Sequence, residues 1–263
     1  MTELDDLRRD LVAEQDALDA VVTDLDPGQW ALPTPSPGWT VADQIGHLTY
    51  FDRAAATAIT DPDAFKASVE ALFTAALDVG PDEFTLGAYR ALDPGALLAE
   101  WRAGRAALAG AAATLTEGDR VDWYGPPMGA KSFLTARLME VWAHGADVVE
   151  AVGATRQPTD RLRHIAQLGY ITRGWSYAVR GEEPPAGTVR LELVAPSGAT
   201  WAWGPEDADD VIRGSAEEFC LVVTQRRHLD DTDLVAGDLG RHWLLRAQAF
   251  AGPPTLGPAP EGA

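Results

Sequence analysis

The most informative segment for the fold is Trp39-Thr40-Val41-Ala42-Asp43-Gln44-Ile45-Gly46-His47-Leu48. It contains both the start of a helix and a candidate metal ligand. Thr40 suits a helix N-cap, and Asp43 follows three residues later, close to the pattern of a capping box. His47 then lies mid-helix among apolar neighbours, with Phe51 one turn further on. The stretch therefore predicts a long helix from about residue 41 to 59 with a histidine on its apolar side.

The same apolar period recurs on both sides of this helix. It begins with Leu4, Leu7 and Leu11, and the first helix stops at Asp26-Pro27-Gly28. Asp93-Pro94 is a second clear start, with proline at the first helical position. The expected helices cover about residues 4–25, 41–59, 63–77, 93–115, 132–151 and 159–180. Five or six helices with short connections predict a mainly α protein built on an antiparallel bundle.

The pattern changes near residue 182. Residues 189–194 alternate like a half-buried strand, and residues 200–204 read as a second strand after a Pro-Ser-Gly turn. Two helical stretches follow, at about 215–227 and 237–250. We therefore expect a helical bundle over residues 1–182 and a small C-terminal α+β domain over residues 183–263.

Charge limits the partners that this chain can have. It carries 40 Asp and Glu residues against 21 Lys and Arg, for a formal net charge of -19. Such a field repels phosphate backbones and anionic lipids, so we expect no nucleic-acid partner and no membrane partner. An anionic substrate would need a local group of arginines.

Cysteine content and the chain's start favour a cytoplasmic protein. Cys220 is the only cysteine, which excludes an internal disulfide and a cysteine-rich zinc site. The first residues are charged and amphipathic, unlike a signal peptide, and no apolar run approaches the roughly 18–20 residues that span a bilayer. The oligomeric state is not predicted by these features.

Glu140 and His144 are the second half of a possible metal site. They are four residues apart in a helical segment, so they share one face. With His47 from another helix they would form a set of two imidazoles and one carboxylate, which leaves part of an ion open. The spacing alone does not exclude the ordinary alternatives, in which His47 is a core histidine and Glu140 is an exposed acidic residue of the helix.

The chain resembles the DinB-like superfamily and, within it, the mycothiol-dependent maleylpyruvate isomerase branch. That family carries a W-x-V-x-D-x-x-x-H-L segment, matched here by Trp39 to Leu48, and a later Glu-x-x-x-His pair followed by Gly and Asp, matched by Glu140 to Asp147. The resemblance implies that His47, Glu140 and His144 hold one divalent metal ion. The C-terminal sequence is closer to an actinobacterial subgroup than to the isomerases. We therefore expect this chain to share the bundle and the metal site of the family, whereas its substrate can differ from that of the isomerases.

The resemblance also implies a function. Family members use the metal ion to activate mycothiol for addition to a small electrophile. We expect Zn²⁺ in this chain, and Ni²⁺, Fe²⁺ or Mn²⁺ would suit the same ligands. The expected activity is an isomerase or S-transferase with a small-molecule thiol and a small substrate as partners. The isomerase's C-terminal domain contributes an arginine, and Arg226 or Arg227 is the candidate here; a pair of arginines favoured at a helix end is the plain alternative. Metal-dependent hydrolysis and a non-enzymatic metal-binding stress protein are the competing functions.

Overall fold

The computed structural model describes residues 2–262, except for the side chains of residues 76 and 77. By its internal contacts the chain divides into two compact units, Met1–Arg156 and Gln157–Ala263. The domain boundary expected from composition, between the ranges 1–182 and 183–263, lies later in the chain; the end residues 1 and 263 are outside the described part. Each unit is described separately below.

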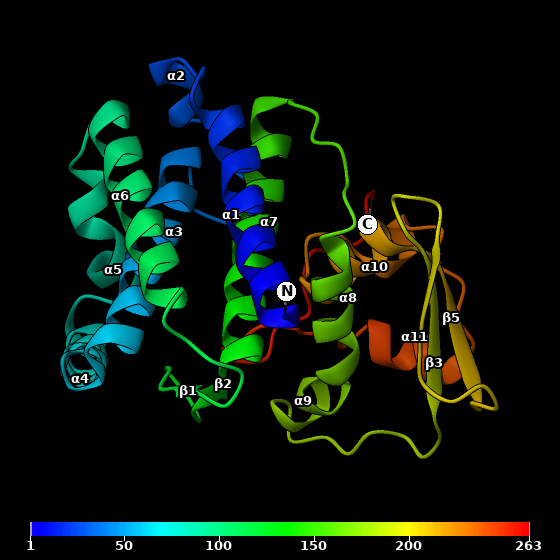
Figure 1. Cartoon of the computed structure of the whole chain (residues 1–263). Helices are drawn as coiled ribbons and strands as arrows, with labels where there is room; N and C mark the ends of the chain where they lie inside the picture. Colours follow the sequence, from blue (N-terminus) through cyan, green and yellow to red (C-terminus); the bar gives the residue numbers. More distant parts are fainter. Residues whose placement is uncertain (1, 263) are drawn as a thin grey trace. The chain divides into compact units, whose positions relative to one another are not determined.

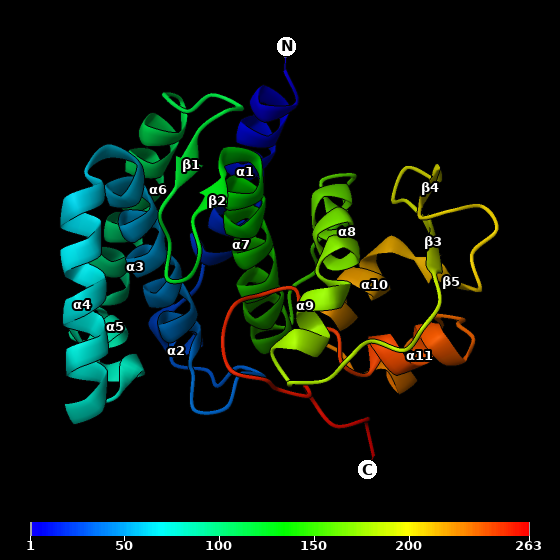
Figure 2. The same ribbon diagram turned by 90° about the horizontal axis from the view of Figure 1, so that it is seen from below.

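The first unit is a bundle in which four long helices form a ring. Helix α3 packs against α6 and α7, and α1 packs against the same two helices. Figures 1 and 2 show these helices running side by side. Their bounds are Glu3–Val22 for α1, Val41–Thr60 for α3, Pro94–Ala112 for α6 and Ala130–Val152 for α7. The predicted helical bundle is confirmed.

Shorter elements close the bundle on one side and at one end. Helices α4 (Pro62–Asp78) and α5 (Pro81–Arg90) pack on α3 and on each other. Strands β1 (Arg120–Val121) and β2 (Met128–Gly129) pair antiparallel directly before α7. The short α2 (Pro27–Trp30) lies between α1 and α3 in the chain.

Helix starts follow the signals in the sequence. The Thr40 side chain accepts from the Asp43 backbone N–H, and the Asp43 carboxylate accepts from the Thr40 N–H at 2.9 Å, which completes the predicted capping box. Asp93 caps α6 by accepting from the Ala96 N–H, with proline at the first helical position. Both caps fix where α3 and α6 begin.

The second unit is a small α+β structure. Its sheet has the order β4-β3-β5, with β3 (Val189–Val194) antiparallel to β4 (Thr200–Trp203) and parallel to β5 (Asp210–Ser215). Helices of this unit contact the sheet, among them α8, α10 and α11 (Figure 2). The helices of the unit are α8 (Leu162–Ile171), α9 (Arg173–Ala178), α10 (Ala216–Val223), the 3₁₀ turn η1 (Leu229–Asp231) and α11 (Asp238–Leu244).

Several element boundaries differ from the sequence prediction. The expected helix at 159–180 is two helices, because Thr172 leaves helical geometry while its hydroxyl bonds to the Leu168 carbonyl. The helix expected to reach residue 227 ends at Val223, and Gln225 then takes a left-handed φ of 58°. The last predicted helix ends at Leu244 instead of residue 250. Helix α5 and strand β5 were not predicted.

Across the described residues, none of the helices has the length and apolar character that a membrane crossing needs.

Candidate metal centre

Three side chains from two bundle helices converge at one point. His47 comes from α3, whereas Glu140 and His144 come from successive turns of α7. The Glu140 Oε2 atom lies 3.4 Å from His47 Nε2 and 3.1 Å from His144 Nε2. All three possible ligand atoms lie within 4.8 Å of one another. Sequence reasoning named these three residues, and the structure brings them together.

The spacing of these atoms suits a small divalent ion. Ligands about 2.1 Å from a tetrahedral ion are separated by roughly 3.4 Å. The two contacts to Glu140 Oε2, at 3.1 and 3.4 Å, already have this separation. The donor set of two imidazoles and one carboxylate therefore fits a zinc-like ion and leaves a position for an outside ligand.

The hydrogen bonds of Gln44 fix the orientation of the His144 ring. The Gln44 Nε2 atom lies 2.9 Å from Thr34 Oγ1 and 3.3 Å from an Asp147 carboxyl oxygen, so this atom is the amide nitrogen. Gln44 Oε1 then faces His144 Nδ1 at 2.5 Å and accepts a hydrogen bond from the Nδ1–H group. A neutral His144 consequently presents a bare lone pair on Nε2.

That lone pair faces another acceptor. His144 Nε2 and Glu140 Oε2 are 3.1 Å apart, and neither atom brings a proton when the imidazole is neutral and the carboxylate ionised. Two acceptors at this distance repel unless a cation lies between them. A proton on the imidazole or a bound metal ion would supply it, so this point is a candidate metal site.

Buried polar groups hold Gln44 in place in turn. Asp147, one turn after His144 on α7, accepts hydrogen bonds from Gln44 and from the Ser36 hydroxyl at 2.9 Å. The Thr34 hydroxyl bonds to the Trp39 carbonyl, which closes the loop before α3. Gln44 is fully buried and Asp147 nearly so. Sequence reasoning missed the role of Gln44, although both it and Asp147 lie inside the motifs that carried the resemblance.

Aromatic rings surround the two histidines. Trp39 stacks on His144 with ring centroids 5.9 Å apart and an interplanar angle of 17°, and its indole N–H bonds to Asp82 on α5. Phe51, one turn after His47 on α3, packs against that imidazole at 4.5 Å. These contacts restrict ring rotation, so both imidazoles stay aimed at Glu140.

The centre remains reachable from outside. The side chains of His47, Glu140 and His144 are 17%, 24% and 11% exposed. Burial opposes ionisation of Glu140, but hydrogen bonds and charge from His144 and His47 outweigh it and hold the Glu140 pKa well below its usual range. The site thus combines an ionised carboxylate with access for a small ligand.

A buried ion pair links the two helices that carry the ligands. Arg137, one turn before Glu140, donates to Asp52 at 2.8 Å, and Asp52 lies five residues after His47. Gln15 of α1 also donates to Asp52, at 3.1 Å. Both charged side chains are almost completely buried. The pair fixes α3 against α7 close to the centre, and sequence reasoning did not find it because neither residue stands out in a helical pattern.

Arg226 and Arg227, the predicted anion receivers, lie in the second unit after the end of α10. Arg226 donates to the Thr224 carbonyl at 2.8 Å and is half-buried, whereas Arg227 is exposed. The argument that a helix C-terminus favours them is weakened, because α10 ends three residues before Arg226. Their role toward a substrate stays a prediction.

Cys220 is not a reactive thiol. It is fully buried in α10, and burial raises its pKa well above the usual range. A buried thiol that stays protonated is a poor nucleophile.

The fold and the cluster define a class of protein: a helical bundle with a candidate His-Glu-His metal site between two of its helices, followed in the chain by a small α+β unit. The sequence profile of the mycothiol maleylpyruvate isomerase N-terminal domain matches residues 11–149. The chain therefore belongs to this family. A second profile, described as wyosine base formation, matches residues 185–237.

Relatives and solved structures agree with this assignment. An uncharacterised protein of Mycobacterium tuberculosis, present in two strains, is 48% identical over 249 residues, which are 94% of this chain and 96% of the relative. The crystal structure of the mycothiol-dependent maleylpyruvate isomerase superposes with a TM-score of 0.59 at 18% identity, covering 90% of this chain and 94% of that one. A single-residue variant of that enzyme gives a TM-score of 0.57 at 18% identity, covering 86% and 90%. At this identity the structures show that the fold is shared.

Proposed function

We propose that this protein binds one divalent metal ion through His47, Glu140 and His144 and uses it to activate mycothiol for addition to a small electrophile. The observation that carries the proposal is the convergence of His47, Glu140 and His144, whose candidate ligand atoms lie within 4.8 Å of one another. Family membership supplies the thiol, since the profile that matches is that of a mycothiol-using enzyme. The reaction class is isomerisation or S-transfer.

The residues of the centre have separate tasks. A bound ion would supply a residual positive charge of about +1 that lowers the pKa of a ligated thiol from near 8.5, with Zn²⁺ the default and Ni²⁺, Fe²⁺ or Mn²⁺ suited to the same ligands. Glu140 supplies the one negative charge among the ligands. Gln44 keeps the Nε2 lone pair of His144 directed inward. Trp39 and Phe51 limit ring motion and keep one side of the centre apolar.

The thiol has to come from outside the chain. Cys220 is buried and its pKa is raised, so it offers no thiolate at neutral pH. The partly exposed ligands leave room for a low-molecular-weight thiol to reach the ion. This makes mycothiol a cosubstrate, with a small substrate as the second partner.

An anionic substrate would need a cationic receiver in this acidic chain. We propose Arg227, with Arg226 as the second candidate. The guanidinium of Arg227 is exposed, and Arg226 donates to a backbone carbonyl of its own loop. An arginine receives a carboxylate through two parallel hydrogen bonds, which fixes its orientation.

Thermal unfolding with and without mycothiol tests the proposal. Metal-loaded protein should gain about 2.7 kcal/mol at a mycothiol concentration 100 times its Kd, whereas protein stripped of metal should gain almost none. S-methyl mycothiol, which has no free thiol, should stabilise neither form. Equal stabilisation of both forms by mycothiol would contradict a metal-bound thiol.

Variants and substrates separate the remaining alternatives. His47→Ala should lose both metal and the mycothiol effect, while His164→Ala, a histidine of the second unit, should keep both. Turnover of maleylpyruvate with mycothiol would identify isomerisation, and accelerated conjugation of mycothiol to monobromobimane would identify S-transfer. Hydrolysis of ester substrates by the metal-loaded protein without any thiol would favour a hydrolase instead.

A further inference from the structure

The second unit contains a cavity of about 520 Å³ that the proposed reaction does not use. It is lined by Arg180, Glu182, His228 and Arg246 together with apolar side chains and the tail at residues 256–260. Pockets for small organic molecules have volumes of about 300–1,000 Å³, so this cavity has the size of a ligand site. A much smaller cavity of about 10 Å³, the space of one water molecule, adjoins it and shares His228 in its lining.

The charges that line the cavity do not balance. Arg246 Nε donates to a Glu182 carboxylate oxygen at 2.6 Å, so these two charges compensate each other. Arg180 donates to the Ser176 carbonyl at 2.6 Å, to the Gln248 side-chain oxygen at 3.5 Å and to the Thr255 carbonyl. These acceptors are all uncharged. The described lining therefore carries one positive charge in excess, within a chain whose net charge is strongly negative.

Desolvation makes that excess charge costly. Burial lowers the pKa of Arg180; Arg246 lowers it further, while Glu182 acts in the opposite direction. A bound anion would relieve this cost, because a charge-assisted hydrogen bond to a partly buried guanidinium is among the stronger polar contacts in proteins.

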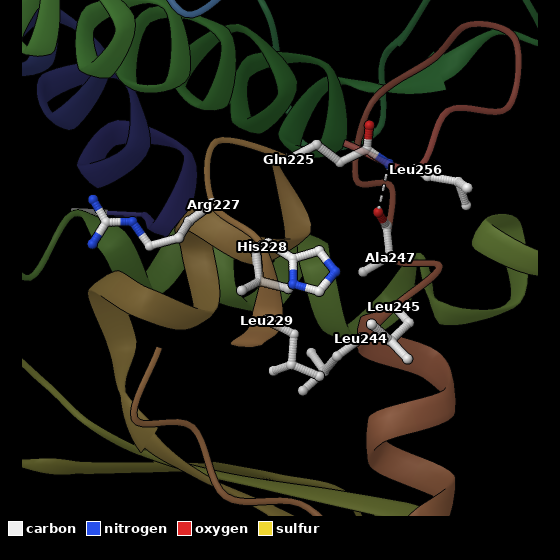
Figure 3. A pocket seen from close by; sticks show the side chains of 9 residues that line it. Gln225, Arg227, His228, Leu229, Leu244, Leu245, Ala247 and Leu256 are labelled. Carbon is white, nitrogen blue, oxygen red and sulfur yellow. Dashed lines mark hydrogen bonds between the residues drawn. The ribbon is translucent and has the colours of Figure 1, made fainter. Parts of the chain in front are cut away.

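His228 contributes a further hydrogen-bond donor. Its Nδ1 atom accepts from the Asp230 backbone N–H at 3.1 Å, where it caps η1. With Nδ1 engaged as an acceptor, Nε2 is the ring nitrogen that can donate. Figure 3 shows His228 directed toward the residues of the smaller cavity, while Arg227 points away from them. Among the polar side chains of the lining, Arg180, Arg246 and His228 can donate, and Glu182 offers a carboxylate.

The remaining walls are apolar. Leu245 and Leu256 line the cavity, and the tail adds Pro258, Ala259 and Pro260. Thr255 fastens this tail, because its N–H and carbonyl bond to Gln248 and Arg180. A ligand that matches both kinds of wall has an anionic head and an apolar body.

We propose that this cavity is a second ligand site that binds a small organic anion, a carboxylate with an apolar chain or ring. The carboxylate takes the place beside Arg180 and Arg246, and the apolar part lies against Leu245, Leu256 and the tail. The site uses none of the metal ligands, so its occupancy does not depend on the proposed function.

Octanoate is a suitable probe, measured by displacement of the fluorescent anion anilinonaphthalene sulfonate from the full-length protein. Octanoate should bind saturably, while inorganic phosphate and octylammonium should not displace the dye. Arg246→Gln should weaken octanoate binding about ten- to hundredfold. Arg241→Gln, the same change on an exposed arginine of α11 that does not line the cavity, should leave the Kd unchanged within twofold.

Glu182→Gln is the decisive variant, because the proposal predicts the direction in which octanoate affinity changes. It removes the one negative charge from the lining and frees Arg246, so octanoate should bind severalfold more tightly. A purely structural role for the Arg246–Glu182 pair would make both of its variants weaken binding. Weaker binding to Glu182→Gln, unsaturable binding, or equal affinity in all variants would each overturn the proposal. The result should be the same in His47→Ala, which separates it from any failure of the metal centre.

Discussion

The Nδ1 atom of His144 on α7 lies 2.5 Å from the Oε1 atom of Gln44 on α3, so the helix that carries His47 also orients the other histidine of the centre. Partners of this kind typically change metal affinity 10- to 100-fold when they are lost. Gln44→Met keeps the length of the side chain but removes the acceptor. We expect about 10- to 100-fold weaker zinc binding with the helical content retained, measured by zinc titration and circular dichroism.

The matched control for this variant is Gln29→Met. Gln29 caps the short α2 through a hydrogen bond to Asp26 and is distant in sequence from the ligands. It should leave zinc affinity unchanged. Equal zinc affinity in Gln44→Met and the wild type would mean that Gln44 does not position the histidine.

The fold of the bundle was predictable because its signals are local. The capping box at Thr40 and Asp43 and the proline after Asp93 fix helix starts through contacts within a few residues. The candidate ligands His47, Glu140 and His144 were accessible to the same reasoning, because helical spacing places Glu140 beside His144 and the resemblance adds His47.

The rest of the centre depends on contacts far apart in the chain. Gln44 and His144 are separated by 100 residues, and Asp52 and Arg137 by 85. A sequence pattern on one helix cannot indicate which residue of another helix will face it. Strand β5 was missed for a similar reason, since it is stabilised by parallel pairing with β3 across a crossover and not by an alternating pattern of its own.

Metal should matter more for binding and activity than for folding. The bundle buries Leu7, Leu18, Trp101 and many other apolar side chains, so it has a core without an ion. His144→Ala should lose stoichiometric zinc, measured by elemental analysis, yet still unfold cooperatively in urea. An unfolded His144→Ala protein at room temperature would indicate a structural ion instead.

Removing one partner of the buried pair of Asp52 and Arg137 should destabilise the fold more than removing both partners together. Asp52→Asn leaves the Arg137 charge buried and unpaired, which typically costs about 3–5 kcal/mol of unfolding free energy. The double variant Asp52→Leu with Arg137→Met should recover most of this loss, because both charges leave together. Urea unfolding measures both effects.

An exposed ion pair between α3 and α6 serves as the comparison. Arg53 and Glu100 form an ion pair with side chains 45% and 44% exposed. Glu100→Gln should cost less than about 1 kcal/mol. A loss of similar size from Glu100→Gln and Asp52→Asn would show that burial is not what makes the Asp52 pair important.

Asp19 should make stability depend on pH. A hydrogen bond from Arg102 outweighs burial and, with Thr23 and the charge of Arg105, lowers the Asp19 pKa in the folded protein. Its contribution is therefore complete above the unfolded-state pKa of about 3.9 and is lost as pH falls through the lower folded-state pKa. The difference in unfolding free energy between wild type and Asp19→Asn should be largest near neutral pH and shrink below about pH 4. A difference for Asp19→Asn that stays constant across this pH range would contradict the assignment.

Arg226 and Arg227 should differ sharply when each is replaced by lysine. The side chain of Arg226 donates to the Thr224 carbonyl, whereas the Arg227 side chain is exposed. Lysine keeps the charge but cannot offer two parallel hydrogen bonds to a carboxylate. Losing such a contact typically costs about 1.5–3 kcal/mol, or roughly ten- to hundredfold in rate. We therefore expect Arg227→Lys to lower kcat/KM for an anionic electrophile by that factor with metal content unchanged, and Arg226→Lys to be nearly silent.

An uncharged electrophile should be turned over equally by both variants and the wild type, because it has no carboxylate to receive. Equal and negligible effects of both substitutions on the anionic substrate would remove the second unit from the reaction and leave substrate binding to the bundle alone.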